Sequence, residues 1–310
     1  MSGIVVVGGS GFVGRAVLSA LRHLGVSARP LAAPRLHESQ GGRDGLLGDL
    51  AVNLEGAAAV VNAAVVARAT AIDDPVLWAA NAELPGTLLN ACRRAGVPRM
   101  VHVSSAAVQG RRPELDSSWE HAAFSSYSAS KAAGEDRLRT MGGDDWTIFR
   151  PGGVHGASRS VTRAIARLAQ SPIAIAPRTP QPSPQALIEN VASAAAWLAV
   201  HDGSLPKVVH HPSEGMTTHS VLQLLGGKEP RLVPDRVADL VLAAGLSASH
   251  TAPPLAGLER RLSTLWAGQR QAPSWLTQAG WRPVTPPEQG WRQLGMTLRR
   301  IQPQQSKDLV

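Results

Sequence analysis

The chain has 310 residues, of which 44% are apolar and 17% charged, a composition typical of globular rather than disordered proteins. Its net charge is +8, yet the basic residues are scattered and aromatic residues make up only 4%, so the sequence does not predict nucleic-acid binding. The single cysteine, Cys92, excludes an internal disulfide framework.

No apolar run reaches the ~20 residues that a membrane span needs, and the first run, Ile4–Val7, is too short for a signal peptide. We therefore expect a cytoplasmic protein with no membrane segment.

Short apolar runs alternate with amphipathic stretches through the first half of the chain. The runs read as buried strands at Ile4–Val7, Ala28–Ala32, Ala59–Asn62, Met100–Ser104 and Trp146–Phe149. The stretches between them predict helices at Phe12–Leu24, Val76–Ala95 and Tyr127–Met141. Because each parallel crossover needs a covering helix, this alternation predicts an α/β fold with a doubly wound parallel sheet.

The pattern changes after Pro151. Five prolines in Pro172–Pro184 predict a loop between helices near 161–170 and 188–201. Residues 203–301 mix short strands and helices with several tryptophans, and we expect a smaller mixed α/β lobe. The predicted domains are a dinucleotide-binding domain at 1–156, a substrate lobe at 157–301 interleaved with the last sheet strands, and a flexible tail at 302–310.

A glycine-rich turn follows the first strand and opens the first helix. Gly8, Gly11 and Gly14 would permit a tight turn, close approach to a pyrophosphate, and close packing of the helix on the strand. With 30 glycines in the chain, this spacing arises by chance about 0.3 times, so its place between strand and helix carries the prediction. The alternative is a turn with a structural role only. The prediction is a Rossmann dinucleotide site that includes Ser10, Phe12 and Val13.

The end of the second predicted strand bears on which dinucleotide binds. An acid there would accept the ribose hydroxyls of NAD, whereas an arginine would accommodate the extra phosphate of NADP. The strand is followed by Arg35, with no acid before Glu38, and Arg15 directly follows the last glycine of the turn. We expect NADP, with NAD as the alternative; either arginine could equally be a solvated surface residue.

The only tyrosine of the chain, Tyr127, lies four residues before Lys131, one of four lysines. Helical spacing places both side chains on one face. A neighbouring ammonium stabilises a phenolate, and a phenol tuned in this way can transfer a proton while hydride moves at the same carbon. The alternative is a helix-surface pair with no role.

With these motifs in place, the sequence resembles the extended short-chain dehydrogenase/reductase superfamily, in its NAD(P)-dependent epimerase/dehydratase group. The resemblance covers residues 4–156 and fades afterwards. The matching segments, in chain order, are the glycine turn, Gly48-Asp49-Leu50, Asn62-Ala63-Ala64, residues 81–87, residues 101–110, the Tyr127–Lys131 pair and residues 150–156.

The resemblance implies roles for individual residues. Ser105 would hydrogen-bond the substrate oxygen, with Ser104 the weaker candidate; Tyr127 would be the general acid/base, and Lys131 would hold the ribose and lower the pKa of the tyrosine. The implied cofactor contacts also include Asp49 on the adenine side, Leu50, Ala63, Ala64 and Pro151.

Several departures from the family pattern affect the substrate. Gln109 and His155 replace usual tyrosines, and Ser183 stands where nucleotide-sugar enzymes often carry a phosphate-clamping arginine. Ala106 and Ala107 replace the acids of the sugar 4,6-dehydratases, which disfavours that branch.

We expect an oxidoreductase or epimerase acting on an activated sugar or similar polar keto compound. The alternatives are a reductase of a non-sugar carbonyl in secondary metabolism, or a non-catalytic dinucleotide sensor or assembly protein. The expected partner is a small molecule, with a nucleotide sugar as one candidate, and a homodimer is left open.

Two further features are read as structural. His210-His211 lacks a third ligand at a recognisable spacing, so we expect a surface pair and no metal site. Cys92 falls within a predicted helix and should pack as a small apolar residue.

Overall fold

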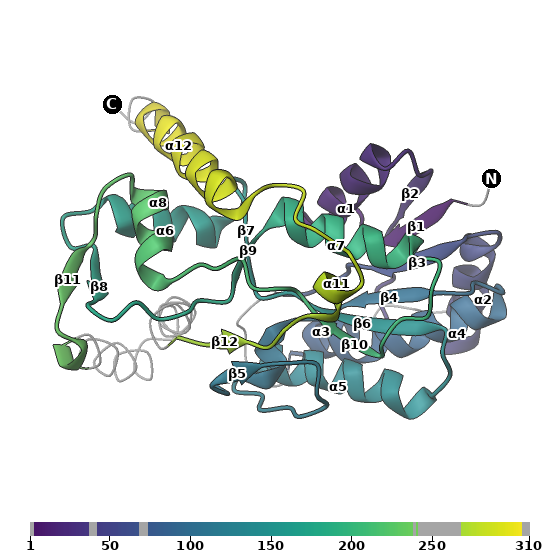
Figure 1. The fold of residues 1–310 in the computed structure, drawn as a ribbon. Coiled ribbons are helices and arrows are strands. Elements are labelled where there is room, and N and C mark those ends of the chain that lie inside the picture. Colours follow the sequence, from purple (N-terminus) through teal and green to yellow (C-terminus); the bar gives the residue numbers. More distant parts are fainter. Residues whose placement is uncertain (1–2, 37–41, 68–73, 238–239, 241–267, 306–310) are drawn as a thin grey trace.

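The computed structural model describes residues 3–36, 42–67, 74–237, 240 and 268–305. Its centre is a six-stranded sheet in the order β10-β6-β4-β3-β1-β2, and all neighbouring strands are parallel (Figure 1). The strands are β1 (Ile4–Val7), β2 (Ala28–Leu31), β3 (Ala59–Asn62), β4 (Met100–Val103), β6 (Trp146–Arg150) and β10 (Val208–His210). The strand order reverses between β1 and β3, as expected of the predicted doubly wound sheet, which is confirmed.

Helices cover both faces of this sheet (Figure 1). One face carries α1 (Phe12–His23) and α7 (Ile188–Val200); the other carries α2 (Gly42–Leu54), α4 (Leu84–Arg94) and α5 (Ser126–Met141). Successive side chains of a strand point to opposite faces of the sheet. Ile4 and Val6 therefore pack toward α1 and α7, whereas Val5 and Val7 pack toward α2 and α4. The apolar runs of the sequence are thus buried on both faces, which is why they show no polar alternation.

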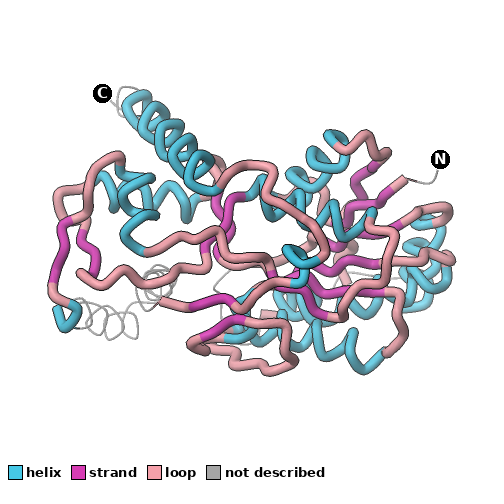
Figure 2. Tube along the Cα trace, viewed as in Figure 1, coloured by secondary structure: helices cyan, strands magenta, loops and turns pink. Residues whose placement is uncertain are grey.

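A smaller lobe lies beside the sheet, at the left of Figure 1. Its own core joins α6 (Ser160–Gln170), α8 (Thr218–Gly226) and α12 (Pro287–Gln305) around the fully buried Trp291. Among the described residues, three pairs of short parallel strands lie outside the central sheet (Figure 2). These pairs are β7 (Gly153–His155) with β9 (Gln185–Leu187), β8 (Ile175–Pro177) with β11 (Arg231–Val233), and β5 (Glu114–Leu115) with β12 (Arg270–Gln271).

The structure differs from the sequence prediction in several elements. The predicted loop Pro172–Pro184 contains the strand β8, which pairs with β11 although its own last residue is Pro177. The predicted helix Val76–Ala95 is three joined pieces, α3 (Pro75–Trp78), the π-helical turn η1 (Ala79–Glu83) and α4. Helix α2 was not predicted. Helix α12 extends to Gln305, into the predicted tail, and residues 306–310 lie outside the described part; the domain boundaries stay a prediction.

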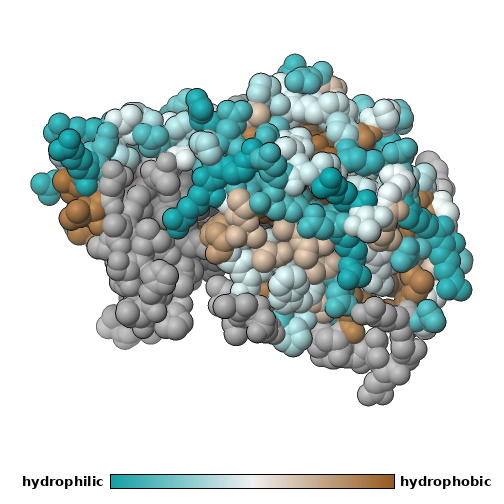
Figure 3. Space-filling model, turned by 90° about the horizontal axis from the view of Figure 1, so that it is seen from below, coloured by the Kyte–Doolittle hydropathy of each residue, from teal (hydrophilic) through white to brown (hydrophobic). Residues whose placement is uncertain are grey.

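No described helix is both long and apolar enough to cross a bilayer. On the face that Figure 3 shows, brown hydrophobic atoms gather near the centre and at the edges, with teal hydrophilic atoms between them.

Candidate active site

The predicted site residues follow the carboxyl ends of neighbouring parallel strands. Gly8 follows β1, Ala63 follows β3, Ser104 follows β4 and Pro151 follows β6. Parallel strands point the same way, so these positions share one edge of the sheet, the edge where open α/β sheets bind ligands. The backbone ties them together: Ala63 donates to the carbonyl of Val7 at 2.9 Å, and Ser104 to that of Phe149 at 2.7 Å.

The glycine turn is closed so tightly that side chains do not fit at two of its positions. A Cβ on Gly14 would lie 2.2 Å from the carbonyl oxygen of Gly8, and a Cβ on Gly8 would lie 2.7 Å from the backbone of Ala64. Gly8 also has a φ of 76°, which glycine adopts without strain. Helix α1 begins after Gly11 with no side chain capping it, so its first N–H groups are open to an anion. This cradle fits a pyrophosphate.

The other residues predicted to contact the dinucleotide at this turn differ in their exposure to solvent. Phe12 is partly buried, and a Cβ on Gly156 would lie 3.0 Å from its ring, so the turn contacts the segment that enters the smaller lobe. Ser10 is exposed, and its carbonyl accepts a hydrogen bond from Arg15. Val13 is partly buried against the core.

The residues predicted to select the dinucleotide or to lie on its adenine side are mostly at the surface. Arg15, Arg35 and Asp49 are exposed, whereas Leu50 is buried against the core. Asp49 lies within α2, where its carbonyl accepts a hydrogen bond from Asn53, and not at the end of a strand. Their contacts with a cofactor remain predictions.

Helix α5 places the tyrosine and the lysine one turn apart. Ser125 caps the helix, and its hydroxyl and that of Ser128 each accept a hydrogen bond from the other residue's backbone N–H. Tyr127 is partly buried, but Lys131 is fully buried, and its Nζ donates to the carbonyl oxygen of Val103 at 2.8 Å. Burial lowers the pKa of Lys131 to about 8, although the charge of Glu135 raises it. The lysine therefore ties α5 to the end of β4, two residues before Ser105.

The two adjacent serines face different surroundings. The hydroxyl of Ser104 is buried and donates to the carboxylate of Glu135 at 2.5 Å. Ser105 is partly exposed and caps the short helix η2 (Ala106–Gln109) by accepting from the N–H of Ala107 at 3.2 Å. Ser104 is committed to the interior, so Ser105 is the serine open to a ligand.

The sequence motifs gave no role to two residues that shape this edge. Asn81, in the π-helical turn η1, exchanges hydrogen bonds with the backbone of Val66 and donates to Ser130 of α5. The backbone carbonyl oxygen of Asn81 would lie only 2.3 Å from a Cβ placed on Gly134. Helix α5 therefore passes very close to η1. His102 lies between Asn62 and Lys131. Asn81 falls inside a quoted motif and His102 inside an apolar strand, but neither pattern shows these contacts.

Three of the substrate-related departures, Gln109, His155 and Ser183, are internal side chains. Gln109 exchanges two hydrogen bonds with Asp116, and His155 lies between Thr162 and Gln185. Ser183 is 3% exposed and accepts from Gln185, so it presents nothing to a phosphate.

The expectation of a surface histidine pair is wrong. His210 is buried, with its ring between the hydroxyl of Ser117 and the carbonyl of Ala272, and His211 is packed against Phe149 and Trp281. Cys92 is 1% exposed in α4, as predicted.

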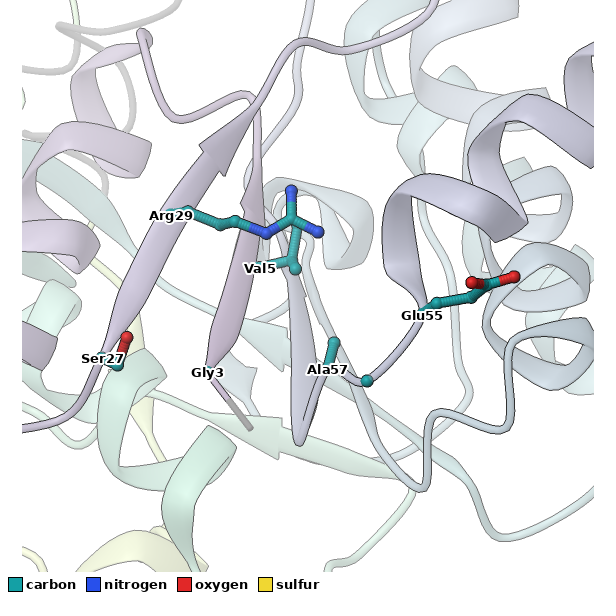
Figure 4. Close-up of a pocket in the computed structure, with 7 residues that line it drawn as sticks. Gly3, Val5, Ser27, Arg29, Glu55 and Ala57 are labelled. Atoms are coloured by element: carbon teal, nitrogen blue, oxygen red, sulfur yellow. The ribbon is translucent and has the colours of Figure 1, made fainter. Parts of the chain in front are cut away.

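Two cavities lie away from the glycine turn. One of about 250 Å³ is at the amino ends of β1, β2 and β3, the opposite edge of the sheet; Figure 4 shows Arg29 reaching over Val5 there while Glu55 points away. The other, of about 920 Å³, lies between α8 and α12 in the smaller lobe.

Comparisons with known proteins agree with this fold. Among solved structures, the fold matches a UDP-glucose 4-epimerase of Thermus thermophilus in complex with NAD (TM-score 0.66, 22% identity, 96% of this chain and 98% of that one). It also matches a dTDP-4-dehydrorhamnose reductase of Bacillus anthracis in complex with NADP (TM-score 0.67, 15% identity, 96% and 99%).

A curated protein of Stigmatella aurantiaca, a 4-hydroxy-2-methyl-3-oxo-4-farnesyl-3,4-dihydroquinoline-1-oxide ketoreductase, is 34% identical over 170 residues. That match covers 49% of this chain, and the chain spans about half the length of the curated relative. Residues 4–176 match the model of the NAD dependent epimerase/dehydratase family. The chain belongs to this family of enzymes, as its ordered motifs predicted.

Proposed function

We propose that the protein is a nicotinamide-dependent carbonyl reductase that interconverts a ketone and a secondary alcohol. The observation that carries the proposal is the position of Lys131: it is buried one turn after Tyr127 in α5 and bonded to β4, the strand that leads to Ser105. A bound nicotinamide would supply or accept the hydride.

The chain's own groups have separable tasks. Tyr127 would deliver a proton to the carbonyl oxygen during reduction, or remove it from the alcohol during oxidation. Lys131 in its ammonium form would stabilise the phenolate, and Ser105 would donate a hydrogen bond that orients the same oxygen. The cradle formed by Gly8, Gly11 and Gly14 would hold the pyrophosphate.

The cofactor we propose is NADP, because β2 is followed by Arg35, with no acid before Glu38, and Arg15 directly follows the last glycine of the turn. Arg35→Glu should weaken NADPH binding more than NADH binding, as measured by quenching of protein fluorescence; equal weakening of both would contradict the preference.

For the substrate, the similarity to a quinoline ketoreductase favours a non-sugar ketone. The buried Ser183 supports this choice, because it offers no cation to a nucleotide phosphate. Epimerisation of a nucleotide sugar is the second candidate, since the structures of sugar enzymes match the fold over 96% of the chain. Reduction of cyclic ketones, compared with epimerisation of nucleotide sugars, separates the two.

The decisive variant is Tyr127→Phe, which removes only the phenolic hydroxyl. We expect turnover to fall by about 10²-fold or more while NADPH binding persists. Ser105→Ala should also lower turnover, whereas Ser104→Ala, the matched control, should chiefly lower stability. Turnover unchanged in Tyr127→Phe would refute the proposal.

A further inference from the structure

A row of three buried polar side chains runs across the sheet beneath the proposed active site. Nδ2 of Asn62, at the end of β3, lies 3.1 Å from Nδ1 of His102 on β4. Nε2 of the same imidazole lies 3.3 Å from Nζ of Lys131 on α5. All three side chains are at most 1% exposed, so none of them faces bulk solvent.

The backbone of Ala64 determines how this row is protonated. Its N–H donates to Oδ1 of Asn62 at 3.2 Å, which turns the amide NH₂ toward His102. Turning the amide over would bring two donors together at Ala64. Nδ1 of His102 must then be an acceptor, because an amide nitrogen can only donate. Burial and the nearby Lys131 hold the pKa of His102 well below its usual value, so the ring is neutral and its one proton sits on Nε2.

The consequence falls on Lys131. An ammonium has donors only, so it would face the Nε2–H group of His102 with a second donor. A neutral amine can instead accept that hydrogen bond while still donating to Val103. We propose that His102 is a positioning residue whose Nε2–H group binds the neutral amine of Lys131 and opposes its ammonium form. The proposal extends the role of Lys131 in the proposed function: His102 would set the alkaline limit of the activity.

The charges around Lys131 act on the same balance between its amine and ammonium forms. Among the described residues, Glu135 acts on Lys131 from one turn further along α5, and it favours the ammonium form. That carboxylate is already paired with Arg150 of β6 and with His121, so it offers Lys131 no direct contact. Burial outweighs its charge and lowers the pKa of Lys131 to about 8. Lys131 thus changes between its ammonium and amine forms near pH 8, where a hydrogen bond from His102 to the amine can shift the balance between them.

The composition of the chain allows a direct measurement. There are only four lysines, so protein labelled with ¹³C at lysine Cε gives four signals, and Lys131→Met identifies the one that disappears. The test is the pH titration of that signal in the nucleotide-free protein, which requires no substrate and no turnover. We expect a midpoint about two units below the usual lysine value of about 10.4.

Two variants of His102 separate its two contacts. In His102→Gln, an amide oxygen can occupy the position of Nε2 and accept from the ammonium, so the midpoint should rise by about one unit or more. In His102→Asn, the shorter amide replaces Nδ1, keeps the contact with Asn62 and cannot reach Lys131, so the midpoint should rise less. The alkaline limb of kcat/KM should move in the same order.

The outcomes decide between the alternatives. A wild-type midpoint near the usual lysine value, or the same midpoint in the wild type and His102→Gln, would overturn the role of His102. Equal shifts of the Lys131 midpoint in both variants would show that the packing of the imidazole ring matters and its N–H group does not. That result would also overturn the proposed role of His102. Failure of the proposed function would instead appear as undiminished turnover in Tyr127→Phe, with the lysine titration unaffected.

Discussion

The carboxylate of Glu135 and the guanidinium of Arg150 meet in the interior at 2.5 Å, with no exposed surface on either side chain. Glu135 also accepts from His121 and Ser104, and Arg150 also donates to the carbonyl of Ser118. Burial alone would raise the pKa of Glu135, but its hydrogen bonds from His121 and Arg150 hold it below the usual value. The pair thereby joins α5, β6 and the loop before α5 that contains Ser118 and His121.

Breaking this pair should be costly, because it leaves a buried charge without its partner. Arg150→Met should lower the free energy of unfolding by about 3–5 kcal/mol at pH 7, measured by urea denaturation. Arg150→Lys should recover little, since a point charge cannot make the forked contacts of a guanidinium. The double variant Glu135→Leu with Arg150→Met should be more stable than Arg150→Met alone. A double variant no more stable than the single one would show that the pair itself is not the source of the loss.

The same carboxylate predicts a dependence of stability on pH. Its folded-state pKa lies below the unfolded one, so its contribution is present above the unfolded value of about 4.5 and is lost as pH falls through the folded value. Wild-type stability should fall more steeply below about pH 4.5 than that of Glu135→Gln. Parallel pH profiles of the two proteins would contradict the assignment.

The glycine turn gives a prediction with a matched control. Gly14→Ala places a Cβ 2.2 Å from the carbonyl oxygen of Gly8, whereas a Cβ on Gly45, in α2, meets nothing within 4 Å. NADPH binding should weaken by about tenfold or more in Gly14→Ala, since the turn must open. Gly45→Ala should bind as the wild type does. Equal affinities in both variants would mean that the turn is not the pyrophosphate site.

The sheet and its helices could be predicted because their signals are local. The apolar runs at Ile4–Val7 and Ala59–Asn62 match the strands residue for residue, since burial on both faces leaves one unbroken signal. β8 could not be predicted, because its pairing with β11 joins residues more than fifty positions apart within a proline-rich stretch. For the site, the motifs located Tyr127 and Lys131, whereas the contacts of His102 depend on which strands lie side by side.

The buried Lys131 should lower the free energy of unfolding. Its folded pKa is lowered by burial to about 8, below the unfolded value of 10.5, so the cost is fully present below pH 8 and is relieved as pH rises toward 10.5. Lys131→Met fills similar space without the charge, and it should stabilise the protein by about 2 kcal/mol at pH 7 after the loss of the bond to Val103. The gain should shrink between pH 8 and 10.5. Urea denaturation at several pH values tests this, and a destabilised Lys131→Met at pH 7 would contradict it.

Cys92 offers a reporter for these stability differences. Burial, followed by the charge of Asp145, raises the pKa of its thiol to about 12, so the reactive thiolate is scarce at pH 8. An aromatic disulfide reagent should react slowly with the native protein, at a rate set by opening of the core around α4. Arg150→Met should accelerate the reaction in proportion to its lost stability, and Cys92→Ser should abolish it. Rapid labelling of the native protein, with no acceleration in Arg150→Met, would show that the thiol is accessible without unfolding.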